Sequence, residues 1–101
     1  MTKTRKQIAT ELVATTGRAY ARKSSKHITV FVFTKSLMDT DKLIQTFGGS
    51  RYKHLDGYYW YLGKKKDLLA MWEEIYPLLI LAGTPKPPRL KPLYELALRF
   101  L

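Results

Sequence analysis

The side chains best suited to chemistry in this sequence are cations that alternate with aromatic rings. Arg18 and Arg22 stand on either side of Tyr20 at two-residue spacing, and Arg51 and Lys53 repeat that spacing later in the chain. Cationic side chains neutralise phosphates and release counterions, whereas planar rings stack on bases or sugars. The two residue types together indicate a partner that carries both phosphates and flat rings.

The overall charge points the same way. The 101 residues include 18 Lys and Arg against 8 Asp and Glu, which gives a net charge of +10. Residues 67–101 hold equal numbers of basic and acidic side chains, so the surplus lies in the first two-thirds of the chain. A surplus of this size on one small domain is typical of proteins with a polyanionic partner, and we expect that partner to be RNA or DNA.

The sequence contains few residues that could support other kinds of chemistry. The chain has no cysteine and two histidines, His27 and His54, which excludes disulfides, a thiol nucleophile and a cysteine-ligated zinc site. We expect no metal and no cofactor. The longest apolar run, residues 78–82, is too short to span a membrane, and the basic start, residues 1–7, has no apolar core behind it. We therefore expect an intracellular protein, cytoplasmic or organellar, that does not contact a membrane.

The first half of the chain predicts a helix followed by a hairpin. Apolar residues at helical spacing over residues 4–16 predict the helix, and Gly17 is expected to end it in the left-handed conformation. Alternating patterns over residues 18–24 and 27–35 predict two strands joined by a short connection. Because this connection is short, we expect the two strands to form an antiparallel hairpin.

The second half repeats this order and adds two helices. Residues 36–47 predict a helix, and Asp56-Gly57 predicts a hairpin with a type I′ turn. Asp67 is expected to cap a third helix whose end is perturbed by Pro77.

The last segments complete the predicted organisation. Four prolines in residues 84–92 predict a stiff, extended connector, and residues 93–101 predict a closing helix. The fold class is thus α+β, in the order α-ββ-α-ββ-α-α, with a four-stranded antiparallel sheet backed by helices. We expect one binding domain over residues 1–83, the connector, and a C-terminal helix that packs on the same domain.

Alternation along each strand predicts which side chains lie on the uncovered face of this sheet. Aliphatic positions of residues 28–32 point to the core, and Tyr52, His54, Tyr58, Trp60 and Leu62 are expected to point there too. The residues expected on the free face are Arg18, Tyr20, Arg22, Phe31, Phe33, Arg51, Lys53, Tyr59 and Tyr61. Lys26, Lys64 and Lys65 in the flanking loops complete the predicted nucleic-acid-binding set. The alternative is that the aromatic residues form a second core face covered by another chain.

Two sequence stretches carry a resemblance to a known family. DKLIQTFGGSRYKHLDGYYWYL (residues 41–62) and KDLLAMWEEIYPLL (residues 66–79), in this order of elements, resemble the LAGLIDADG homing endonucleases. The resemblance runs over residues 9–79. It implies a saddle-shaped sheet that lies along DNA, a homodimer formed through the first helix, and an acidic residue at the end of that helix that binds a divalent metal.

The chain departs from the family at that acidic position. When the final glycine of the family motif is placed on Gly17, the metal-binding acid falls on Thr16 and an earlier acid falls on Ala14. A neutral hydroxyl cannot replace an anionic oxygen ligand of Mg²⁺, so we expect no catalytic residue. Glu11 also stands where the family uses glycine for close helix contact, which disfavours the dimer unless a residue such as Arg5 or Arg18 pairs with it. The alternative is a monomer whose C-terminal helix covers the first helix.

These observations lead to three hypotheses. The first is a non-catalytic nucleic-acid-binding protein that grips RNA or DNA with a basic and aromatic sheet face. The second is an active homing endonuclease or intron maturase, because the family also includes members that assist intron splicing. The third is a structural RNA-binding component of a ribonucleoprotein such as a ribosome.

Overall fold

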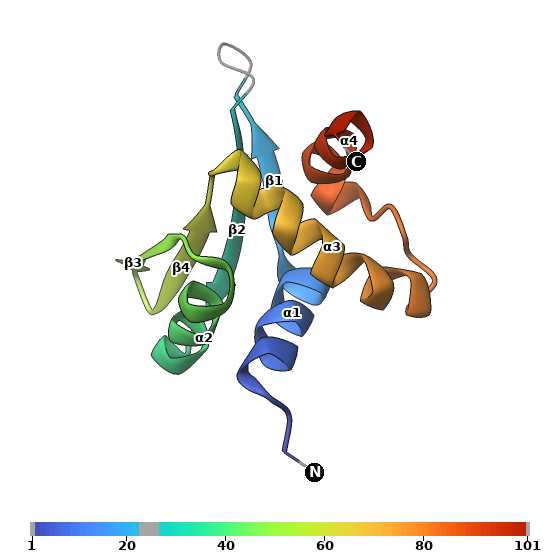
Figure 1. The fold of residues 1–101 in the computed structure, drawn as a ribbon. Coiled ribbons are helices and arrows are strands. Elements are labelled where there is room, and N and C mark those ends of the chain that lie inside the picture. The colour runs from blue at the N-terminus through green and yellow to red at the C-terminus, as the bar shows by residue number, and fades with distance from the viewer. Residues whose placement is uncertain (1, 23–26, 101) are drawn as a thin grey trace.

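A computed structural model describes residues 2–22 and 27–100 of the chain (Figure 1). Its elements, in order, are α1 (Arg5–Thr16), β1 (Arg18–Ala21), β2 (Ile28–Thr34), α2 (Leu37–Phe47), β3 (Ser50–His54), β4 (Gly57–Leu62), α3 (Lys65–Leu81), the 3-10 helix η1 (Pro88–Leu90) and α4 (Lys91–Phe100). The predicted α+β order is confirmed, with η1 as an addition. Within the described residues, no helix is long and apolar enough to cross a membrane.

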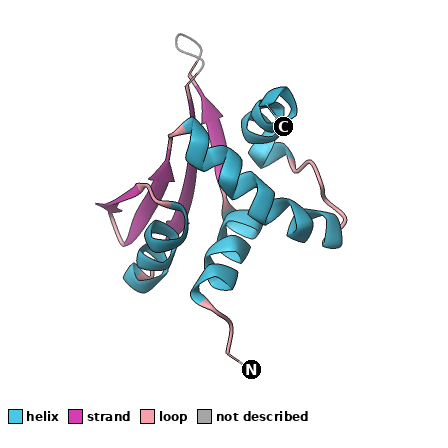
Figure 2. Ribbon diagram, in the orientation of Figure 1, coloured by secondary structure: helices cyan, strands magenta, loops and turns pink. Residues whose placement is uncertain are grey.

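The four strands form one antiparallel sheet in the order β1-β2-β4-β3. All helices lie over one face of this sheet (Figure 2). Fully buried side chains such as Val30, Val32 and Trp60 point from the sheet into the layer between sheet and helices. The opposite face has no helix on it, so its side chains meet solvent.

The helices share the covered face in a fixed arrangement. α1 packs against α2 and α3, while α4 packs against α3 and the β1 strand (Figure 1). The alternative in which the C-terminal helix covers the first helix is therefore wrong. Leu93, Leu96 and Ala97 of α4 are buried in the common core, so α4 extends the core over β1 instead.

Local capping explains where two of the helices begin. The N–H of Gln7 donates to Thr4 Oγ1 at 3.1 Å, and the N–H of Thr4 donates to Gln7 Oε1 at 2.7 Å, which is a complete capping box for α1. Ser36 caps α2 by accepting from the N–H of Asp39. For α3 the predicted cap was wrong, because Lys64 is the N-cap residue and Asp67 lies in the first turn, where a carboxylate still favours the helix dipole.

The prolines interrupt helices less than the sequence predicts. α3 continues through Pro77 to Leu81, because Pro77 is exposed and solvent can reach the carbonyl that lacks a helical donor. The predicted extended connector contains η1, in which Leu90 is fully buried. α4 begins at Lys91, before Pro92, since a proline in the first helical turn loses no hydrogen bond.

The junction between α2 and β3 is held by the Trp60 side chain. The Trp60 indole is fully buried, and its Nε1–H donates to the Gly48 carbonyl oxygen at 2.8 Å. Gly48 and Gly49 have φ angles of 88° and 86°, a region in which other residues are strained. A Cβ atom on Gly49 would lie 2.3 Å from the Tyr61 carbonyl oxygen. The Gly-Gly pair therefore lets the chain turn tightly over Trp60.

The end of α1 is held by an arginine from the far end of the chain. Gly17 is extended there, with φ −65° and ψ 145°, and not left-handed as predicted. The Arg89 guanidinium donates to the Gly17 carbonyl at 2.7 Å, to the Val13 carbonyl at 3.4 Å and to the Ala14 carbonyl. A cation on the last carbonyls of a helix satisfies their hydrogen bonding and favours the helix dipole.

We expect Arg89→Met to lower the free energy of unfolding by about 1.5–3 kcal/mol, because several carbonyls would lose a charged donor. Urea unfolding followed by circular dichroism measures this value. Arg99→Met, which removes an exposed arginine of α4, is the matched control and should change stability by less than about 0.5 kcal/mol. Equal losses in the two variants would contradict the role given to Arg89.

Candidate functional site

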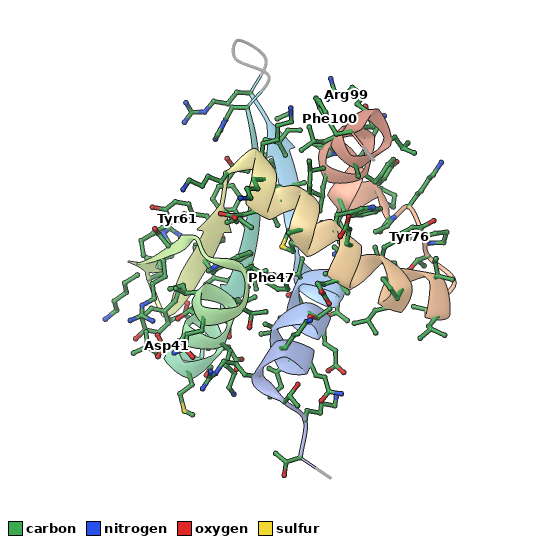
Figure 3. All side chains as sticks on the ribbon, in the orientation of Figure 1. Asp41, Phe47, Tyr61, Tyr76, Arg99 and Phe100 are labelled. Atoms are coloured by element: carbon green, nitrogen blue, oxygen red, sulfur yellow. The ribbon has the colours of Figure 1, made fainter. Side chains whose placement is uncertain are left out.

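The uncovered side of the sheet is a continuous surface of aromatic rings. We call this surface the aromatic face and define it by Tyr20, Phe31, Phe33, Tyr52, Tyr59 and Tyr61. Neighbouring ring centroids are 5.1 to 6.3 Å apart, so each ring contacts at least one other. Figure 3 shows Tyr61 on the sheet side of the molecule and Tyr76 over α3 on the helix side.

Cross-strand pairing brings these rings together. In an antiparallel sheet, directly opposite residues point to the same face. Phe31 lies opposite Tyr61, Phe33 lies opposite Tyr59, and Tyr59 lies opposite Tyr52. The expectations that Tyr20, Phe31, Phe33, Tyr59 and Tyr61 lie on the free face are therefore confirmed.

The faces predicted for the third strand are wrong. Tyr52 and His54 lie on the aromatic face, where both contact the Tyr59 ring. Arg51 lies on the helix side instead, where its guanidinium pairs with Asp41 of α2 and is 3.4 Å from Thr40 Oγ1. Lys53 shares that side by alternation. Every residue of β3 is exposed, so burial does not distinguish its two faces and the pairing with β4 decides.

The turn before β4 also differs from the prediction. His54 pairs with Gly57, so the two loop residues are Leu55 and Asp56. Among the residues that the structure describes, Leu55 is the only non-glycine residue with positive φ, so the turn is not type I′. Gly57 is required for a different reason, because a Cβ atom there would lie 2.4 Å from the Phe33 ring.

Two arginines flank hollows in the aromatic face. The first hollow, about 660 Å³, is lined by Thr16, Arg18, Tyr20, Phe31, Phe33, Tyr52 and Tyr59. The second, about 420 Å³, is lined by Arg22, His27, Thr29, Phe31, Tyr52, Tyr61 and Gly63. Phe31 and Tyr52 line both, so the hollows adjoin each other. Each hollow therefore combines aromatic walls with one guanidinium.

The predicted lysines have different positions. Lys65 Nζ lies 3.2 Å from the centre of the Phe100 ring, which places its ammonium group against α4. Lys64 directly follows Gly63, which lines the second hollow, and is exposed. Lys26 lies outside the described residues.

Acidic side chains are kept away from this surface. Seven of the eight carboxylates belong to helices, and Asp56 lies in the turn between β3 and β4. The strands as described contain no Asp or Glu, and Arg18 lies in β1 with Arg22 just after it. The aromatic face is therefore bordered by cations without opposing carboxylates of its own.

The end of α1 does not provide the ligands that a divalent metal needs. The Thr16 hydroxyl donates to the Leu12 carbonyl at 2.6 Å, and no carboxylate stands in its place. Within residues 2–22 and 27–100, no three His, Asp or Glu side chains cluster. Two guanidinium groups lie near this helix end, those of Arg89 and Arg18. Burial and, second, the positive charge of Arg18 lower the pKa of Arg89 from its usual value. The residues present do not fit the metal that the family resemblance implies.

Glu11 pairs with a basic residue. Its carboxylate accepts from Lys3 Nζ at 2.8 Å, and not from Arg5 or Arg18, the two examples considered from the sequence. The pair is partly exposed, so it contributes little to stability by itself.

Three residues that line the site were not predicted from the sequence. These are Tyr52, which lines both hollows, His54, which contacts Tyr59, and His27, which lines the second hollow beside Thr29, a residue that alternation along its strand places on the free face. The signal in the sequence that could have placed Tyr52 correctly is its position opposite Tyr59 in the second hairpin. Two residues that face each other across a hairpin must share a face, whatever their polarity.

No model of a known protein family matches the sequence, and no curated protein matches it. The fold is similar to that in the crystal structure of the homing endonuclease I-CvuI in complex with its target (Sro1.3) in the presence of 2 mM Ca. The TM-score is 0.54 at 17% sequence identity, and the match covers 94% of this chain and 80% of that chain. The chain therefore has a homing-endonuclease-like α+β fold, and an identity this low supports no more than the fold.

The close contact between Gly57 and Phe33 can be tested by a double-mutant cycle. We expect Gly57→Ala to destabilise the protein by about 0.5–1.5 kcal/mol, because the Phe33 ring must turn away from the new methyl group. In a Phe33→Ala background the same change should cost less, so the two substitutions should couple by at least about 0.5 kcal/mol. Urea unfolding of the four proteins measures the coupling, and additive losses would contradict the contact.

Proposed function

We propose that this chain is a non-catalytic nucleic-acid-binding protein that grips RNA or DNA with the aromatic face. The observation that carries the proposal is the aromatic face itself, bordered by Arg18 and Arg22 and without a carboxylate on its strands. Guanidinium groups bind phosphates, and aromatic rings stack on bases. Protein interfaces also contain aromatic residues, but a surplus of ten positive charges favours a polyanion.

The similarity in fold supports this proposal without deciding it. The homing endonuclease with a similar fold was crystallised with its target, so this architecture can present a surface to such a ligand. Fold alone does not transfer an activity, and the residues of the site must carry the argument.

The end of α1 supports binding without cleavage. Metal-dependent cleavage needs anionic oxygen ligands that hold the metal beside the phosphate under attack. Here Thr16 is neutral, Arg89 occupies the carbonyls of the last turn, and Arg18 follows directly. The guanidinium groups of Arg89 and Arg18 at this helix end would repel a divalent cation and attract a phosphate.

Replacement of the bordering arginines should weaken binding in a salt-dependent manner. We expect Arg18→Gln and Arg22→Gln each to lower affinity and to reduce the slope of log Kd against log salt by about 0.7–0.9, because each loses one phosphate contact. Fluorescence anisotropy with labelled RNA and DNA oligonucleotides over a salt series measures both quantities.

Arg99→Gln is the matched control, since Arg99 is an exposed arginine of α4 on the helix side. Arg51→Gln should behave like this control, because Arg51 pairs with Asp41. An affinity that does not change with salt, or equal losses in all four variants, would contradict the proposed interface.

The absence of cleavage is tested separately. Incubation with Mg²⁺ or Mn²⁺ and a library of double-stranded targets should leave all targets intact, because α1 ends without a carboxylate ligand. Sequencing of fragment ends detects rare cuts. Any specific double-strand cut would contradict the proposal and establish the alternative, an active endonuclease.

A further inference from the structure

We propose that the aromatic face binds unpaired nucleic acid, a single strand of RNA or DNA, in preference to a duplex. This inference rests on the proposed function, because it names the form of nucleic acid that the same face accepts. It is carried by the exposure of the rings, by the distances between them and by the two hollows.

The exposed rings offer flat surfaces for stacking, and the two phenylalanines of the face carry no hydrogen-bonding group. Tyr20 is 55% exposed, Tyr52 44%, Phe33 39% and Tyr61 36%, which are high values for large apolar side chains on a sheet. Sequence reading in a duplex groove uses hydrogen-bond donors and acceptors at base edges. Phe31 and Phe33, on the central strand β2, have none. A ring can stack on a base only when that base has left the helical stack.

The distances between the rings fit separated bases. Across the sheet, the Tyr20 and Phe31 centroids are 5.6 Å apart, those of Phe31 and Tyr61 are 6.2 Å apart, and those of Tyr61 and Tyr52 are 5.8 Å apart. Successive bases within one strand of a duplex are about 3.4 Å apart along the axis. The planes of these ring pairs are inclined to each other by 69°, 37° and 53°, so bases stacked on neighbouring rings would be both separated and tilted, a geometry that an unpaired strand can adopt.

The two hollows divide the face into sites for a base and its phosphate. One has Arg18 beside Tyr20 and Phe33, and the other has Arg22 beside Tyr61 and Thr29. The shared walls, Phe31 and Tyr52, lie between them. Other four-stranded sheets bind two or three unpaired bases on exposed aromatic residues by the same physical means. We infer that an extended strand crosses both hollows.

The test compares oligonucleotides of one mixed sequence, about 16 nucleotides long, as single-stranded RNA, single-stranded DNA, duplex RNA and duplex DNA. We expect the single strands to bind at least tenfold more tightly than their duplexes at the same salt concentration. A 2-aminopurine base in the single strand should change its fluorescence on binding, because that signal depends on stacking. The RNA and DNA arms establish which of the two the face prefers.

Two variants assign the effect to the rings. Tyr20→Leu on β1 and Tyr52→Leu on β3 should each lower affinity for the single strand about tenfold, because a stacking surface is lost. Phe100→Leu is the matched control, since Phe100 is 52% exposed on α4, on the helix side. Circular dichroism confirms that the variants fold.

The outcomes separate the two proposals. Duplexes bound as tightly as single strands would overturn this inference and leave the proposed function standing. Ring variants that lose no more affinity than Phe100→Leu would overturn both, because the proposed function also rests on the aromatic face. Failure of all four nucleic acids to bind at low salt would overturn both.

Discussion

The position of β4 depends on one hydrogen-bonded side chain, Trp60. Its indole is completely buried and its N–H donates to the Gly48 carbonyl, so the strand can neither rotate nor slip without leaving a buried donor unpaired. Because β4 pairs with both β2 and β3, the position of β4 also fixes which residues of these two strands lie opposite it. Tyr59 and Tyr61, on either side of Trp60, must then point away from the helices. The outward direction of Tyr59 and Tyr61 therefore follows from the burial of Trp60 in the core.

A second constraint joins the C-terminal segment to the first helix. Arg89 reaches the last turn of α1 from a residue more than seventy positions away in the sequence. This contact fixes η1, and through it α4, against the sheet edge at β1. Ala19 of β1 is buried on the helix side, which leaves the other side of the strand, with Arg18 and Tyr20, accessible. The segment after the proline-rich stretch therefore helps to define which face is free.

The fold was largely predictable, since its elements follow from strong local signals. Apolar periodicity identified the helices, and β-branched and aromatic runs identified β2 and β4. The site was less predictable, because β3 has no buried residue that would show which of its two sides faces the core. In β3, the alternation of Arg51 and Lys53 with Tyr52 and His54 is compatible with either face. Local polarity favoured the wrong choice, whereas the partner residues Trp60 and Tyr59 determine the right one. Arg89 could not be predicted at all, because no local pattern indicates a capping contact made at such a distance in sequence.

The separation of carboxylates from the aromatic face has a kinetic consequence. Seven acidic side chains lie on the helices and none lies on the strands, so the charge of the molecule is unevenly distributed, and the aromatic face has Arg18 and Arg22 at its border without carboxylates on its strands. A polyanion that diffuses toward such a molecule experiences a torque as well as an attraction, so that collisions occur preferentially with the sheet foremost. The charge pattern thus acts before any contact forms, by orienting the encounter and raising the association rate.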